Sequence, residues 1–119
     1  MIFRLNTTIA TVALVLSAVF SHSIYAASAE EIAEGKRVAF DRKLGNCLAC
    51  HAIAGGNLPG DIGPPLIAMK ARFPDKSVLR AQIYDATAAN PNTMMPPFGK
   101  HGILTDKQVD LVTEFIHTL

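Results

Sequence analysis

Residues 47–51 read Cys-Leu-Ala-Cys-His, and this C-x-x-C-H sequence uses both cysteines of the 119-residue chain. The pattern is typical of covalent c-type haem attachment, in which each thiol adds to one vinyl group of the haem. A histidine that directly follows the second cysteine lies beneath the iron and serves as its proximal ligand. We therefore predict that Cys47, Cys50 and His51 hold one haem c and its iron.

Two other uses of a cysteine pair agree less well with the sequence. A thioredoxin-like dithiol would require a βαβ pattern around the motif, and the flanking residues show none. A structural zinc site needs about four protein ligands. The chain has two cysteines, and no second histidine lies nearby with ligand spacing. The motif thus favours haem.

The first 29 residues have the features of a secretory signal peptide. Arg4 supplies a positive charge, and residues 9–20 form an apolar stretch that is shorter than the roughly 20 residues of a transmembrane helix. Small residues permit cleavage after Ala26 or after Ala29. We predict a signal peptide over 1–29, one domain over 30–119, a periplasmic location and no membrane attachment after cleavage. The alternative is an uncleaved N-terminal anchor.

The charge of the predicted domain is balanced. Without Arg4 the chain has ten lysines and arginines and ten aspartates and glutamates. Nucleic-acid binding requires a clustered basic excess, so nucleic acid is not an expected partner. A domain of about ninety residues buries little apolar surface, so its fold is only marginally stable without a further stabilising element. We expect the haem to supply that element and the apoprotein to be largely unfolded.

Helix signals dominate the predicted domain, and no strand of useful length is present. Ser28 and Glu31 form a capping box at the start of a first helix, and Gly35 inside this helix suggests a close helix crossing. A second helix is expected over 76–88, with four residues facing inward: Val78, Leu79, Ile83 and Ala86. A terminal helix begins with a second capping box at Thr105 and Gln108. Its apolar stripe is Leu111, Val112, Phe115, Ile116 and Leu119.

A methionine on the far side of the haem would complete the iron site. A thioether favours ferrous iron, so His/Met ligation raises the reduction potential and suits electron transfer. We favour Met95 as this ligand because Pro96 follows it directly and stiffens the loop, and Met94 is the adjacent alternative. Met69 is interpreted as a packing residue, and His101 as an exposed loop residue.

The proline-rich segment after the motif is expected to pass along the proximal face of the haem. The carbonyl of Pro64 is our candidate acceptor for the Nδ1 proton of His51, which would orient the ring and raise its basicity. Leu66 is expected to pack against the porphyrin. His117, near the end of the terminal helix, is interpreted as a surface residue.

The order of capped helix, C-x-x-C-H motif, Gly-Pro-x-Leu loop, Met-Pro loop and terminal helix resembles class I cytochromes c. This resemblance implies an all-α fold of three to four helices around one covalently bound haem. Residues 45–53 and the long Met-loop run over 90–105 further resemble the SoxX family. Its members are the monohaem subunits of heterodimeric SoxAX cytochromes in sulfur-oxidising bacteria.

The resemblance implies a role in thiosulfate oxidation. A SoxA-type haem subunit would be the partner and would carry the L-cysteine S-thiosulfotransferase chemistry, in which thiosulfate is joined to a carrier-protein cysteine. This chain would accept the released electrons and pass them to a soluble cytochrome c. It would have no catalytic site of its own. A free-standing diffusible cytochrome c is the main alternative, and a small haem enzyme or gas sensor is a third.

Overall fold

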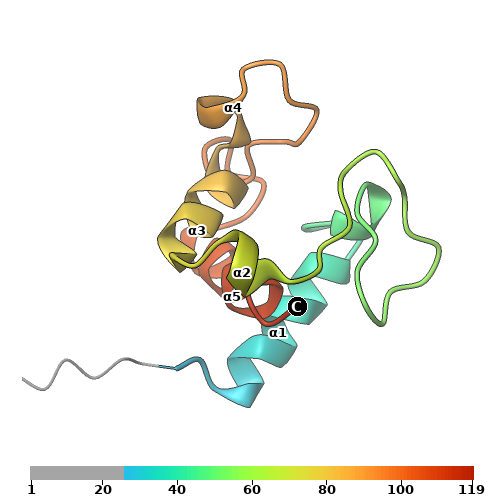
Figure 1. The fold of residues 1–119 in the computed structure, drawn as a ribbon, viewed down its shortest axis with the longest axis vertical. Coiled ribbons are helices and arrows are strands. Elements are labelled where there is room, and N and C mark those ends of the chain that lie inside the picture. The colour runs from blue at the N-terminus through green and yellow to red at the C-terminus, as the bar shows by residue number, and fades with distance from the viewer. Residues whose placement is uncertain (1–25) are drawn as a thin grey trace, which may run out of the picture.

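The computed structural model describes residues 26–119, which form helices joined by long loops (Figure 1). In chain order the helices are α1 (Ala29–Phe40), the 3₁₀ helix η1 (Cys47–Ala49), α2 (Met69–Arg72), α3 (Lys76–Tyr84), α4 (Ala86–Ala89) and α5 (Asp106–Ile116). Residues 26–119 contain no strand, which confirms the all-α prediction. Most of the predicted signal peptide lies outside the described residues. Within 26–119, no helix has the length and apolar character needed to span a membrane.

Both predicted capping boxes are present. The Ser28 hydroxyl accepts a hydrogen bond from the Glu31 backbone N–H, and the Glu31 carboxylate accepts one from the Ser28 N–H at 2.9 Å. Thr105 and Gln108 make the same reciprocal pair at the start of α5. Such caps satisfy N–H groups that have no partner inside the helix. The two helices therefore begin where the sequence predicts.

Helices α1 and α5 cross in close contact, as Figure 1 shows. At the crossing, a Cβ atom on Gly35 would collide with the backbone carbonyl of Leu111. Further along, the rings of Phe40 and Phe115 meet edge to face with centroids 5.8 Å apart, a favourable aromatic arrangement. Gly35 therefore marks the helix crossing, as predicted, because only a residue without a side chain lets the backbones of α1 and α5 approach this closely.

The predicted helix over 76–88 is divided into α3 and α4. Asp85 has a non-helical backbone (φ −149°, ψ 85°), and its carboxylate accepts a hydrogen bond from the Thr87 N–H to cap α4. Leu79, Ile83 and Ala86 are buried as predicted, but Val78 is 54% exposed. The prediction for Val78 was wrong because Leu79 and Ile83 define the buried face of α3, and position 78 lies about 100° around the helix axis from Leu79.

The end of the chain packs over α2. His117 is partly buried, and its Nε2–H donates a hydrogen bond to the Phe73 carbonyl at 3.0 Å. The Leu119 carbonyl accepts a hydrogen bond from the Met69 N–H at 2.8 Å. His117 is therefore not the surface residue that was predicted. Its position in the helix suggested exposure, but the segment between α2 and α3 covers it.

Candidate functional site: a pocket that fits haem c

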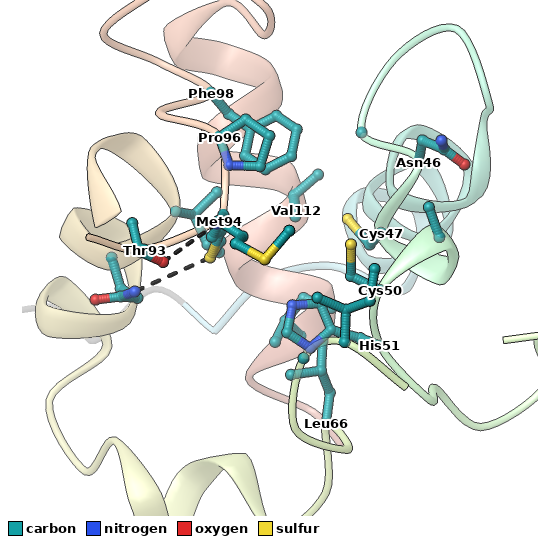
Figure 2. Close-up of a pocket in the computed structure, with 18 of the residues that line it drawn as sticks. Asn46, Cys47, Cys50, His51, Leu66, Thr93, Met94, Pro96, Phe98 and Val112 are labelled. Carbon is teal, nitrogen blue, oxygen red and sulfur yellow. Dashed lines mark hydrogen bonds between the residues drawn. The ribbon is translucent and has the colours of Figure 1, made fainter. Parts of the chain in front are cut away.

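A pocket of about 680 Å³ lies between the C-x-x-C-H segment and the Met loop. Its walls come from residues 42–51, 62–66 and 90–98, and residues of α3 and α5 also line it. The lining is mostly apolar, with Val112 and Ile116 contributed by α5. Figure 2 shows Cys47, Cys50 and His51 on one wall and Met94 across from them. Pockets for small ligands and cofactors typically range from about 300 to 1,000 Å³.

The motif is held against the end of α1 by backbone hydrogen bonds. The Gly45 N–H donates to the Val38 carbonyl at 3.1 Å, and Asn46 then adopts a left-handed conformation (φ 46°, ψ 36°) that begins η1. The His51 N–H donates to the Cys47 carbonyl at 2.9 Å. This tight turn directs both cysteine sulfurs at the pocket (Figure 2). Local backbone geometry therefore brings the two thiols and the imidazole to one wall.

The state of the Cys47 thiol argues against redox chemistry of a free dithiol. Neither cysteine forms a disulfide. Burial raises the pKa of the Cys47 thiol to about 11, so the thiolate is disfavoured at neutral pH. Catalytic dithiols instead have a thiol with a lowered pKa. The thioredoxin-like alternative is thus disfavoured by the surroundings of Cys47 as well as by the sequence around it.

The ring of His51 is oriented by the segment that returns along its side of the pocket. Its Nδ1 lies 2.7 Å from the Pro64 carbonyl oxygen. A carbonyl can only accept, so Nδ1 carries the proton and Nε2 keeps a free lone pair for a metal. A Cβ atom on Gly63 would overlap the imidazole, so the backbone packs directly on the ring. Leu66 is partly buried, packs against the core and lines the pocket.

The Met loop is anchored to the end of α3. The Tyr84 carbonyl accepts hydrogen bonds from the N–H groups of Gly99 and Lys100, at 3.0 and 3.2 Å. Gly99 also lies so close to the Tyr84 ring that a Cβ atom there would collide with it. The Lys100 ammonium forms an ion pair with Asp85 at 2.7 Å. These contacts set the position of the loop relative to the pocket.

The two adjacent methionines of this loop have different surroundings, although both line the pocket. Met95 is partly buried and packs against the core, and its N–H donates to the Thr93 hydroxyl at 3.1 Å. Its sulfur accepts a hydrogen bond from the Gln82 amide nitrogen at 3.9 Å. Met94 is 77% exposed. Of the two, Met95 has the sulfur that the protein holds in place.

The remaining ligand candidates are placed elsewhere. Met69 is 1% exposed, and its sulfur accepts a hydrogen bond from the Arg72 guanidinium at 3.3 Å. This agrees with the interpretation of Met69 as a packing residue, although it also reaches the pocket wall. His101 is exposed, as expected, and is not among the residues that line the pocket.

Sequence reasoning missed Gln82, a polar residue of α3 that lines the pocket. It lies three residues after Leu79, on the side of α3 that also carries the buried residue Ile83. A carboxamide at that place departs from the apolar pattern of the face. This departure was the available signal, because a polar side chain next to an apolar pocket needs a hydrogen-bond partner.

The donor set fits a haem rather than a metal ion bound by the protein alone. Two thiols and one imidazole share a wall, thioethers lie opposite, and the lining between them is mostly apolar. Within residues 26–119, no group of three or more histidine, cysteine, aspartate and glutamate side chains could hold a metal ion. An apolar pocket with two thiols and an imidazole on one wall and thioethers on the other suits a covalently attached iron porphyrin.

Comparison with known proteins agrees with this geometry. The cytochrome c family profile matches residues 32–119. The chain belongs to the cytochrome c family. As a member, it carries a covalently bound haem c with its iron and functions in electron transfer. The Cys47–Cys50 pair matches the attachment motif of this family.

Two individual proteins are similar to this chain. The crystal structure of SoxXA from P. pantotrophus superimposes with a TM-score of 0.65 at 30% sequence identity, covering 72% of this chain and 79% of the other. An "uncharacterized lipoprotein" of Aquifex aeolicus (strain VF5) is 34% identical over 80 residues, which is 63% of this chain. The matched segment spans only 37% of that relative's length. The chain is thus similar to a SoxX-type cytochrome.

Proposed function

We propose that this cytochrome c is the monohaem subunit of a periplasmic SoxAX-type complex in thiosulfate oxidation. It accepts electrons from a SoxA-type partner subunit and passes them to a soluble cytochrome c. The observation that carries this proposal is the similarity to the SoxXA crystal structure, at 30% identity and a TM-score of 0.65. The Met-loop run over 90–105, which resembles SoxX, is part of that similarity.

The proposed haem site uses both walls of the pocket. Cys47 and Cys50 would hold the haem through two thioether bonds, and His51 would bind the iron through Nε2. The hydrogen bond from His51 Nδ1 to Pro64 supports this assignment because it leaves Nε2 free. Met95 would be the second iron ligand; its partly buried position and the hydrogen bond from Gln82 to its sulfur support this assignment. Leu66 packs against the porphyrin.

The division of work between two subunits follows from the side chains available. Once Cys47 and Cys50 are bound to haem, no thiol remains in this chain, because they are its only cysteines. With both His51 and Met95 bound, the iron would also have no open position for a substrate. The bound haem supplies reversible one-electron oxidation and reduction. The chain's residues attach it, orient its ligands and exclude water, and the sulfur chemistry belongs to the partner.

Purification from the native periplasm tests the assembly. We expect the chain to co-purify with a second haem protein of the SoxA type and the pair to have the mass of a heterodimer. The isolated chain should accept electrons from a chemical reductant but show no thiosulfate-dependent turnover until the partner is added. Purification as a monomer that exchanges electrons with an oxidase or reductase would instead support a free-standing carrier. Thiosulfate-conjugating activity of the isolated chain would overturn the proposal.

A further inference from the structure

Gln82 places a hydrogen-bond donor next to the sulfur of Met95. Its Nε2 lies 3.9 Å from Met95 Sδ, within the longer range expected for sulfur acceptors. Gln82 belongs to α3 and Met95 to the loop that follows α4, so the contact joins two separate elements of the site.

The backbone of Met95 has an anchor of its own. Its N–H donates to the Thr93 hydroxyl at 3.1 Å, which sets the start of the side chain but leaves the thioether free to rotate. Methionine has three rotatable side-chain bonds and adapts easily to irregular space. A donor at the sulfur restricts that freedom. The two contacts together hold both ends of the side chain.

We propose that Gln82 is a positioning residue that orients the Met95 sulfur and raises the reduction potential of the haem. The proposal deepens the proposed function, because it rests on Met95 as the second axial ligand. A thioether sulfur has two lone pairs. When the Gln82 carboxamide donates a hydrogen bond to one lone pair, the second lone pair is left for the iron. The same N–H withdraws electron density from the sulfur, so the sulfur stabilises ferric iron less and the ferrous state is favoured.

The surroundings of Gln82 support a directed role. Its neighbours on the same face, Leu79 and Ile83, are buried and apolar. A leucine at position 82 would continue that face. The free-energy cost of partly burying a glutamine amide there is offset only if the amide makes a hydrogen bond. In the structure its hydrogen-bond partner is the Met95 sulfur.

Reduction potentials of three variants test the proposal. Gln82→Leu keeps the approximate size and removes the donor. Gln82→Glu keeps the shape but presents an acceptor-only carboxylate to the sulfur. Asn57→Leu is the matched control: it removes an exposed carboxamide from a residue that does not line the pocket. Haem content and helical circular dichroism establish that each variant is folded.

We expect the potential to decrease in the order wild type, Gln82→Leu, Gln82→Glu. For Gln82→Leu the equilibrium constant for reduction should fall by up to about tenfold, and tenfold corresponds to 59 mV for one electron. The sulfur-to-iron band should shift in both Gln82 variants and stay unchanged in Asn57→Leu. An unchanged potential in both Gln82 variants, or an equal shift in Asn57→Leu, would overturn the proposal.

The same spectra separate this proposal from the ligand assignment. If Met95→Leu abolishes the band while both Gln82 variants match wild type, Met95 remains the ligand and the role of Gln82 is wrong. If the band survives in Met95→Leu, the ligand assignment itself fails. Neither result depends on the SoxA-type partner, because the measurements use the isolated holoprotein.

Discussion

The Nδ1 atom of His51 donates a hydrogen bond to the carbonyl oxygen of Pro64 across 2.7 Å. Both residues lie in the loop between η1 and α2, 13 positions apart in the sequence, and their contact decides which imidazole nitrogen is free to face the pocket. Because Nδ1 carries the proton, Nε2 is the available metal ligand. The loop thus orients His51 and leaves its Nε2 available to bind iron.

Replacement of either motif cysteine should impair haem attachment. Cys47→Ser and Cys50→Ser each remove one thiol that faces the pocket, so we expect a sharp loss of holoprotein yield from cells that mature c-type cytochromes. In wild type, acid-acetone extraction should leave the colour on the protein. A haem that extracts freely from the wild-type chain would contradict covalent attachment.

The two adjacent methionines should behave differently. Met95→Leu is expected to abolish the weak sulfur-to-iron band near the red end of the visible spectrum and to lower the reduction potential, because the soft axial ligand is lost. Met94→Leu should retain the band, since Met94 is largely exposed. The reverse pattern would assign the ligand to Met94. Retention in both single variants would point to Met69 or to compensation by the remaining methionine.

The close crossing of α1 and α5 should make Gly35→Ala destabilising. Helix propensity alone predicts a gain of about 1 kcal/mol, but the added Cβ collides with the Leu111 carbonyl. We expect a net loss of about 1–3 kcal/mol in the free energy of unfolding, measured by guanidinium titration of the holoprotein. Ala33→Ser, at an exposed position of α1, is the control and should change it by less than about 0.5 kcal/mol. A stabilised Gly35→Ala would refute the crossing.

The ion pair that anchors the Met loop should be sensitive to acid. The Lys100 ammonium, with Thr87, holds the pKa of Asp85 below its ordinary value of 3.8. A lowered folded-state pKa stabilises the native protein above pH 3.8, and this contribution is lost as the pH falls through the lower folded value. Unfolding midpoints of Lys100→Met should therefore lie below those of wild type at neutral pH, and the difference should shrink in acid below pH 3.8.

Lys70→Met is the matched control for that experiment, because it removes the same charge from an exposed site on α2. It should not reproduce the pH-dependent difference. If Lys70→Met and Lys100→Met show the same pH profile, the effect belongs to net charge and not to the Asp85 ion pair.

The capping box of α1 predicts the site of signal cleavage. Cleavage after Ala29 would remove Ser28, whose side chain caps the helix, and loss of an N-cap costs about 1 kcal/mol. We therefore expect cleavage after Ala26, which leaves Ser28 in the mature chain. Intact mass of the protein from the periplasm gives the answer. A mature chain that begins at Glu30 would contradict this prediction.

Features that depend on neighbouring residues were predictable from the sequence. Cys47, Cys50 and His51 identify the haem because thioether attachment and proximal ligation require those residues within one turn of the chain. Ser28 with Glu31, and Thr105 with Gln108, mark two helix starts because a capping box spans only four residues. Each of these conclusions concerns contacts that short-range geometry already determines.

Features that depend on packing between distant segments required the tertiary structure. Val78 is exposed because its neighbours on α3 turn toward the pocket, and His117 is covered by the segment after α2, which its own helical pattern does not indicate. The different surroundings of Met94 and Met95, and the approach of Gln82 to the Met95 sulfur, follow from how α3 meets the Met loop. The haem motif consists of residues adjacent in the sequence and can be recognised there. The opposite wall of the pocket forms only when α3, α5 and the Met loop pack together.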